Sequence, residues 1–486
     1  MKSNADRGPA VRRLARLLPV LLIALSVSGC AAVFSGYDTA PNGLPVQDDE
    51  LRELLAATSY DSAFVRVLDD KAAPADELLR VMYRGIVAYY AGAYDSAVAE
   101  LDRAEALAQD RITSSASALA LSSLTNDRVL PYNPGSSERL LLHYYGVLAA
   151  LRAGDREAAA VEARRLSFIL DQLEDRSEDD DDYARIRLRA LLHYLSAVAF
   201  EAYGAFQSAD VSYRRAAALD PALAPPLPSS DSGDVIVVVE RGFVDHLAEE
   251  DVFLLLSPRE VETLSGGPVA DRIALGALIT ARVMAELALR DHPRSWGDGR
   301  PGHYYGRRQV RIASTDTARY DEDPYLLRVA WPSFRGDGRA FGTVVRAGTD
   351  SFEQPAELRA DVSSAVIADF SEQQAAMLAR TVIRSVSRFA LGEAAENKAE
   401  ESSEGLGTLV GILANIGSAA VERADTRSWH LLPSEISVVR MRLPIGEHAV
   451  YAVVETSSGK PVRRVALGRV LVQPGMVTVV SGRLWR

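Results

Sequence analysis

The chain has only one cysteine, Cys30, among its 486 residues. An intramolecular disulfide, a thiolate zinc site and a cysteine nucleophile are therefore not expected, and stability must come from packing. The serine elbow, the paired-histidine metalloprotease motif, the phosphate loop and the dinucleotide fingerprint are missing as well. The seven histidines show no metal spacing. We predict a protein that is not an enzyme and that uses neither a metal nor a cofactor.

Basic residues are outnumbered, with 54 Lys and Arg against 66 Asp and Glu. The formal net charge is −12, and removal of residues 1–29, which carry five cations and one acid, leaves about −16. Nucleic-acid binding is therefore not expected. Hydrophobic residues make up 48% of the chain, which is enough for two or three globular domains with sizeable cores.

The single cysteine closes the run LSVSGC at residues 25–30, which has the pattern of a bacterial lipobox. A cationic segment and the apolar stretch 17–27 precede it, as in a secretory signal, and the stretch is too short to span a bilayer. We predict a signal peptide over 1–29 and a diacylglycerol anchor on Cys30. Because Ala31, and not Asp, follows the cysteine, we expect anchoring at the periplasmic side of the outer membrane.

A tether and a first short helix are expected over 30–75, followed by a helical repeat domain over 76–223. Tetratricopeptide repeats place small residues at the eighth, twentieth and twenty-seventh positions of a period of about 34. Two segments fit this register: the one that has Gly85 at its eighth position, and 187–223. The segment 140–173 fits as a degenerate repeat. The small residues predicted at helix crossings are Gly85, Ala97, Ala104, Ala197, Ala209 and Ala216. The alternative is a set of generic alanine-rich hairpins; true repeats would build a solenoid that binds partners on its concave face.

A Pro/Ser-rich linker at 224–233 is predicted to separate two folding units. Residues 234–486 then read as a β-rich, sandwich-like domain with inserted helices at about 270–290, 371–393 and 406–421. We expect 252–256 to pair with the strand 234–240, and the last four strands to form an antiparallel meander as half of the sandwich. These strands are 436–443, 449–455, 462–472 and 476–484. The predicted fold class is α+β.

Two groups in this domain are candidate binding residues. Arg380, Arg384 and Arg388 recur every four residues, so they would share one helix face and could bind lipid phosphates or an acidic partner. The alternative is structural salt bridges. The second group, Asp425, Arg427 and Trp429, precedes the last strands. It could be functional, or Asp425 and Arg427 could fix a helix-to-strand corner over which Trp429 packs.

The segments ADTRSWHLLP (424–433) and LPIG (443–446) resemble the C-terminal signature of a family of uncharacterised proteobacterial lipoproteins with tetratricopeptide repeats. The strand 235–239 with the following ERGFV, and the helix around 380–384, agree with this resemblance, which covers most of the mature chain. The resemblance implies a lipoprotein but no particular chemistry.

Together these features predict a lipid-anchored periplasmic scaffold or adaptor. Its partner would be another periplasmic or envelope protein, in envelope biogenesis or cell-wall synthesis. The alternative function is an envelope enzyme that acts on peptidoglycan or glycan through carboxylates of the C-terminal domain.

Overall fold

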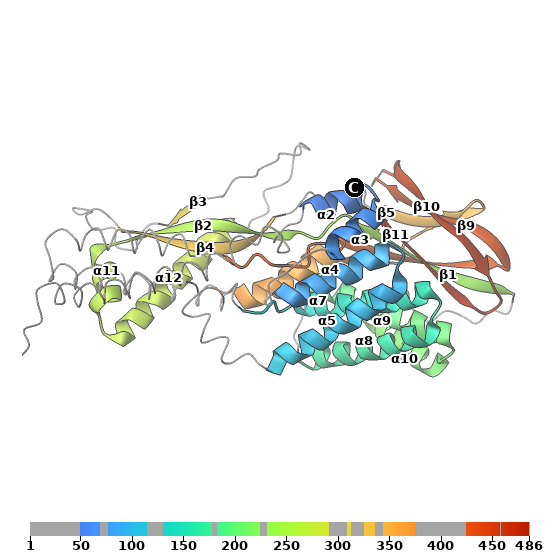
Figure 1. The fold of residues 1–486 in the computed structure, drawn as a ribbon, viewed down its shortest axis with the longest axis horizontal. Helices are drawn as coiled ribbons and strands as arrows, with labels where there is room; N and C mark the ends of the chain where they lie inside the picture. The colour runs from blue at the N-terminus through green and yellow to red at the C-terminus, as the bar shows by residue number, and fades with distance from the viewer. Residues whose placement is uncertain are drawn as a thin grey trace, which may run out of the picture.

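The computed structural model describes residues 49–68, 76–113, 130–176, 182–223, 231–290, 309–312, 325–335, 344–374, 377, 381, 424–456 and 458–485. Helices dominate the N-terminal half and sheets the C-terminal half, which confirms the α+β class (Figure 1). The helices of the N-terminal half are α2 (Asp49–Ala56), α3 (Tyr60–Leu68), α4 (Glu77–Tyr90), α5 (Tyr94–Thr113), α7 (Ser136–Ala153), α8 (Arg156–Arg176), α9 (Tyr183–Tyr203), α10 (Phe206–Leu219) and the 3₁₀ turn Pro221–Leu223.

Six of these helices form three hairpins, α4–α5, α7–α8 and α9–α10. In each hairpin the first helix is followed by a glycine with positive φ, at Gly92 (77°), Gly154 (82°) and Gly204 (93°). Glycine adopts this left-handed conformation without a Cβ clash, so it ends a helix and reverses the chain within two or three residues.

The small residues predicted at helix crossings all lie in the core of these hairpins. A Cβ atom added at Gly85 on α4 would lie 2.7 Å from Leu101 Cδ2 on α5, so the two helices approach too closely for a larger residue. The five alanines are at most 4% exposed; they are Ala97, Ala104, Ala197, Ala209 and Ala216.

A central sheet lies against the hairpins and has the strand order β11-β1-β8-β7. Its strands are β1 (Ser232–Arg241), β7 (Leu358–Asp361), β8 (Glu435–Pro444) and β11 (Val477–Leu484). Strand β1 pairs parallel with β11, Val237 opposite Val480, and antiparallel with β8, Val237 opposite Val439.

An outer sheet of order β10-β9-β5-β6 covers the other face of the central sheet. Its strands are β5 (Val344–Thr349), β6 (Phe352–Pro355), β9 (Gly446–Glu455) and β10 (Pro461–Val472). The last four strands of the chain are therefore shared between two sheets, β8 and β11 in one and β9 and β10 in the other. The predicted meander is wrong, because the chain crosses between the sheets at 444–446 and at 473–476.

The burial of β1 explains its unbroken β-branched sequence. Ile236 and Val238 pack with the helices, whereas Val235, Val237 and Val239 pack against the outer sheet. Helices, central sheet and outer sheet thus form three layers, and one continuous core runs from the helices into the central sheet. The expectation that residues 224–233 separate two folding units is wrong, because neither side buries its apolar face without the other.

A third sheet, β3-β2-β4, forms an arm that extends away from these layers (Figure 1). It comprises β2 (His246–Leu256), β3 (Gln309–Ile312) and β4 (Tyr325–Arg335), with helices α11 (Pro258–Gly266) and α12 (Val269–Arg290) beside it. The helix predicted at 270–290 is confirmed as α12. Strand β2, however, pairs with β3 and β4, so the predicted pairing of 252–256 with β1 is wrong.

Several predicted features lie outside the described residues. They are the signal peptide with Cys30, the helix 406–421, and Arg380, Arg384 and Arg388. The helix predicted at 371–393 begins earlier in the structure, at residue 362, and it is described over 362–374 and at 377 and 381. In the described part of the chain, no helix combines the length and apolar character needed to cross a bilayer.

Candidate functional site

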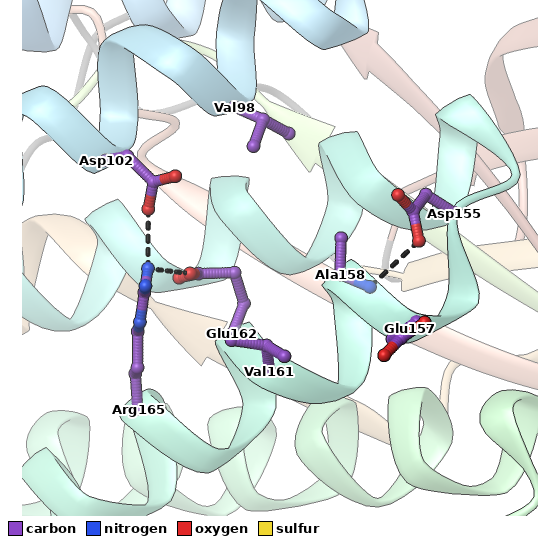
Figure 2. A pocket seen from close by; sticks show the side chains of 8 residues that line it. All are labelled: Val98, Asp102, Asp155, Glu157, Ala158, Val161, Glu162 and Arg165. Carbon is purple, nitrogen blue, oxygen red and sulfur yellow. Dashed lines mark hydrogen bonds and ion pairs between the residues drawn. The ribbon is translucent and has the colours of Figure 1, made fainter.

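A groove of about 330 Å³ lies between helices α5 and α8, the second helices of two successive hairpins. We call it the α5–α8 groove (Figure 2). It is lined by Val98, Asp102, Asp155, Glu157, Ala158, Val161, Glu162 and Arg165. Four carboxylates and one guanidinium leave it strongly negative, with three small apolar side chains among them.

The acidic side chains of the groove have different local roles. Asp155 precedes α8, and its Oδ1 accepts the backbone N–H of Ala158 at 2.9 Å, so it caps the helix N-terminus. Glu157 in the first turn of α8 is exposed. A carboxylate there is favoured by the helix dipole.

Arg165 joins the two walls of the groove. Its Nη1 donates to Asp102 Oδ1 of α5 at 2.5 Å and also to Glu162 of α8 (Figure 2). The side chains of Arg165 and Asp102 are both about half exposed, 47% and 49%. An exposed pair of this kind contributes little to stability and can be exchanged for another ion pair at small cost.

Below the groove, Glu162 contacts the buried His143 of α7. His143 Nδ1 lies 3.0 Å from Glu162 Oε2, and His143 Nε2 lies 3.4 Å from Glu105 Oε2. Burial favours the neutral imidazole, but the two carboxylates outweigh it and raise the pKa of His143. Burial opposes ionisation of Glu105 too, yet hydrogen bonding and attraction from His143 lower its pKa to about 2.

Gly146 lies close to this arrangement. A Cβ atom at Gly146 on α7 would lie 3.1 Å from Glu162 Oε2, so the glycine leaves room for the carboxylate beside His143. The imidazole is thus enclosed between two carboxylates and is 2% exposed. It orients Glu162 and neutralises part of its charge; it offers no accessible base or nucleophile. The groove is therefore suited to binding a cationic group.

In the predicted trio, Arg427 and Trp429 are buried and Asp425 is half-buried. Arg427 donates to Asp425 Oδ2 at 2.6 Å, to Asp76 Oδ1 at 2.8 Å and to the Leu130 carbonyl at 3.0 Å. Burial opposes the charge of Arg427, but Asp425 and Asp76 outweigh it and raise its pKa. These contacts clamp the segment before β8 onto the helical half.

Trp429 is fully buried, and its backbone N–H donates to Glu138 Oε1 of α7 at 2.8 Å. Its ring lies edge-on to Tyr145, with centroids 5.9 Å apart. The trio therefore has the geometry expected of residues that hold this segment in place, with Arg427 paired to Asp425 and Trp429 packed in the core.

Sequence reasoning missed a buried cluster around Glu240 at the end of β1. Its carboxylate accepts hydroxyl hydrogens from Tyr90 at 2.8 Å, Tyr144 at 3.0 Å and Tyr145 at 2.8 Å. Burial raises the pKa of Glu240, although Arg483 and the three hydroxyls oppose this. The adjacent tyrosines in α7 and an acid closing an apolar strand were visible in the sequence, but their pairing was not.

A second missed cluster surrounds Arg440 on β8. Arg440 donates to Asp234 at 2.5 Å, to Glu201 of α9 at 2.9 Å and to the Tyr213 hydroxyl of α10 at 2.7 Å. Together with the Glu240 cluster, it attaches the hairpins to the central sheet. The face of the array formed by α4, α7 and α9 is covered by this sheet. A partner-binding concave face, as the repeats predicted, is therefore not open along these helices.

Comparison with protein-family models, with curated proteins and with solved structures gave no match to this chain. The lipoprotein-family resemblance therefore stays a prediction from the sequence. Within the described ranges, no group of three or more His, Cys, Asp or Glu side chains is arranged to hold a metal ion.

Proposed function

We propose that this protein is an outer-membrane-anchored periplasmic lipoprotein that binds other envelope proteins as a scaffold or adaptor in envelope biogenesis or cell-wall synthesis. The anchor is the acylated Cys30 at the end of the LSVSGC run. The observation that carries the binding role is the α5–α8 groove, which combines acidic and small apolar side chains on the side of the hairpins that faces away from the described sheets.

The hairpins support a solenoid of the tetratricopeptide type. Gly85, Ala97 and Ala104 of the first hairpin, and Ala209 and Ala216 of the last, lie buried where this repeat requires small residues. Successive hairpins also contact one another through α5 with α7 and α8 with α9. Such arrays commonly serve as binding surfaces for other proteins. With α4, α7 and α9 committed to the central sheet, the side formed by α5, α8 and α10 is the one left open to a partner by the described elements.

The charge of the groove indicates the chemistry of the partner. Asp102, Glu157 and Glu162 would attract a segment that carries Lys or Arg, while Val98 and Val161 would contact its apolar side chains. The bridge between Arg165 and Asp102 is exposed, so an incoming cation can replace Arg165 at Asp102.

The enzyme alternative is less well supported by the C-terminal half. Its buried carboxylates are already bound to cations or hydroxyls: Asp234 to Arg440, Glu435 to Arg241, and Glu240 to three tyrosines. Each of these three acidic residues is at most 7% exposed, so a substrate has little access to them.

Crosslinking in living cells tests the proposal. A C-terminally tagged protein with Asp102→Lys and Glu157→Lys should capture far less of the envelope proteins that the wild type captures, because the groove then repels cationic segments. Glu53→Lys with Asp61→Lys, at exposed positions of α2 and α3, makes the same charge change away from the groove and should leave capture intact. Undiminished capture by the groove variant would contradict the proposed site. Deletion of the hairpins is not a suitable test, because it would expose the shared core.

A further inference from the structure

Strand β10 is an unusually long and exposed sheet edge. Among the described strands it pairs only with β9, and it spans twelve residues, Pro461–Val472. Most of its side chains are exposed, among them Val462 at 51% and Leu471 at 63%. An edge strand presents backbone N–H and C=O groups along its open side, which another extended chain can pair with.

The ladder between β10 and β9 is interrupted at two places and regular between and after them. Irregularities occur at 461–463 and at 466–468, and Gly468 has φ +115°. Beyond Gly468 the pairing is continuous for five residues, from Gly468 opposite Val450 to Val472 opposite Gly446. This regular half offers a template long enough for a short added strand.

Arginine side chains lie along this strand. The Arg464 guanidinium lies over the ring of Tyr451, 3.5 Å from its centroid, and stays exposed. Arg469 Nη1 lies 3.5 Å from Glu447 Oε1, and the Arg469 side chain is 74% exposed. Both guanidinium groups thus lie on the surface of the sheet and can contact a further ligand.

These charges decide between the possible occupants of the edge. If β10 paired with β10 of a second copy, the arginines of the two strands would face one another, and like charges across a strand pair are destabilising. An extended segment with acidic residues would instead place carboxylates beside Arg464 and Arg469. The basic strand is also exceptional in a chain of net charge −12, so it would attract acidic segments locally.

We propose that β10 is a second docking surface, which binds an extended acidic polypeptide segment as an additional strand of the outer sheet. The backbone of the segment pairs with the open side of β10. Its alternate carboxylates contact Arg464 and Arg469, and apolar residues on the same face can contact Leu471. This surface is independent of the α5–α8 groove, which attracts cationic segments.

Fluorescence anisotropy with a labelled peptide of five Glu-Val repeats tests the proposal on the purified full chain. The peptide should bind, more weakly at high salt, and a Lys-Val peptide should not bind to β10. Arg464→Glu with Arg469→Glu should weaken binding about tenfold, as expected for the loss of two exposed charge contacts. The milder pair Arg464→Gln and Arg469→Gln should weaken binding less.

The control variant is Arg103→Glu with Arg214→Glu, which makes the same charge change on exposed arginines of α5 and α10. It should change the affinity less than twofold. Equal losses in the control and the β10 variants would show that the peptide responds only to net charge, and would overturn the proposal. So would the absence of peptide binding.

Hydrogen exchange separates strand addition from side-chain attraction. Bound peptide should slow the exchange of backbone amides within 461–472. Binding without such protection would overturn the strand-addition model. A concentration-dependent dimer that protects the backbone amides of 461–472 and resists dispersal by the peptide would assign the edge to a second copy and also overturn it. None of these results depends on the groove, so a failure here leaves the proposed function testable by the groove variants.

Discussion

The hydroxyl of Tyr145 on α7 donates to Glu240 on β1 at 2.8 Å, and this contact joins residues 95 positions apart in the chain. Tyr90 from α4 and Tyr144 from α7 donate to the same carboxylate. One buried acid therefore links two helices to the central sheet. The cluster is a polar connection within an otherwise apolar core, and its loss should be costly.

We predict that Glu240→Leu destabilises the protein by about 3–5 kcal/mol, because it leaves three tyrosine hydroxyls without their buried acceptor and removes the negative charge that attracts Arg483. Tyr145→Phe removes one donor and should cost about 1–2 kcal/mol. Denaturant unfolding measures both. Tyr183→Phe, at a side chain that is 74% exposed, is the control and should have no effect. A Glu240→Leu variant as stable as this control would contradict the role of the cluster.

The second prediction concerns His430, which is fully buried with Nδ1 2.5 Å from the Tyr83 hydroxyl. Burial, with nearby Arg52 and His246, lowers its pKa well below 6.5. Below about pH 6.5 the unfolded chain binds a proton at this position that the folded chain does not. The free energy of unfolding should therefore fall as the pH is lowered from 6.5, by up to about 1.4 kcal/mol per pH unit.

Replacement of the titrating group tests this dependence. His430→Gln should flatten the loss of stability below pH 6.5 in urea titrations at several pH values. His143 is a matched contrast, because its pKa is raised. Its stabilisation is present below the unfolded pKa and is lost as the pH rises through the folded pKa. His143→Gln should therefore flatten the dependence on the alkaline side of 6.5. Identical pH profiles for the wild type and both variants would refute the assignment.

A third prediction tests the close helix crossing at Ala209 on α10, which is 4% exposed. Ala209→Leu should overpack the crossing and cost about 1–3 kcal/mol. Ala218→Leu, at an exposed position of the same helix, should change the unfolding midpoint little. Equal midpoints for the two variants would count against the packing register.

The fourth prediction concerns membrane attachment. Cys30→Ser removes the site of every predicted acyl chain, so the protein should move from the membrane fraction to the soluble periplasmic fraction. Fractionation and immunoblotting measure the distribution. Retention of the variant in the outer membrane as fully as the wild type would show that the lipobox prediction is wrong.

Local patterns were sufficient for many elements. The β-branched run at 235–239 predicted a strand, and the structure has β1 there, buried on both faces. The apolar stretch at 270–290 predicted α12 within one residue of its start. The small residues of the hairpins predicted buried positions that the structure confirms. These features depend on periodicity and residue size, which neighbouring residues determine.

Pairing between distant segments could not be read in this way. Strand β2 has the composition expected of a neighbour of β1, yet it pairs with β3 and β4 in the arm. The strands β8 to β11 alternate between two sheets, although their turns are those of a meander. Backbone hydrogen bonds between strands do not depend on the identity of the side chains. The packing of the whole chain therefore decides which neighbour a strand pairs with.

By itself, the sequence determined the α+β class and the small residues that the hairpins bury, and it predicts the signal region with Cys30. Only the tertiary structure decided that the hairpins and the central sheet share one core, and that Glu240 and Arg440 each connect them. It also decided that Arg427 and Trp429 are internal, and that the α5–α8 groove and the β10 edge are exposed. Periodicity reports which side of an element is apolar, but the identity of the surface that covers that side depends on segments hundreds of residues away.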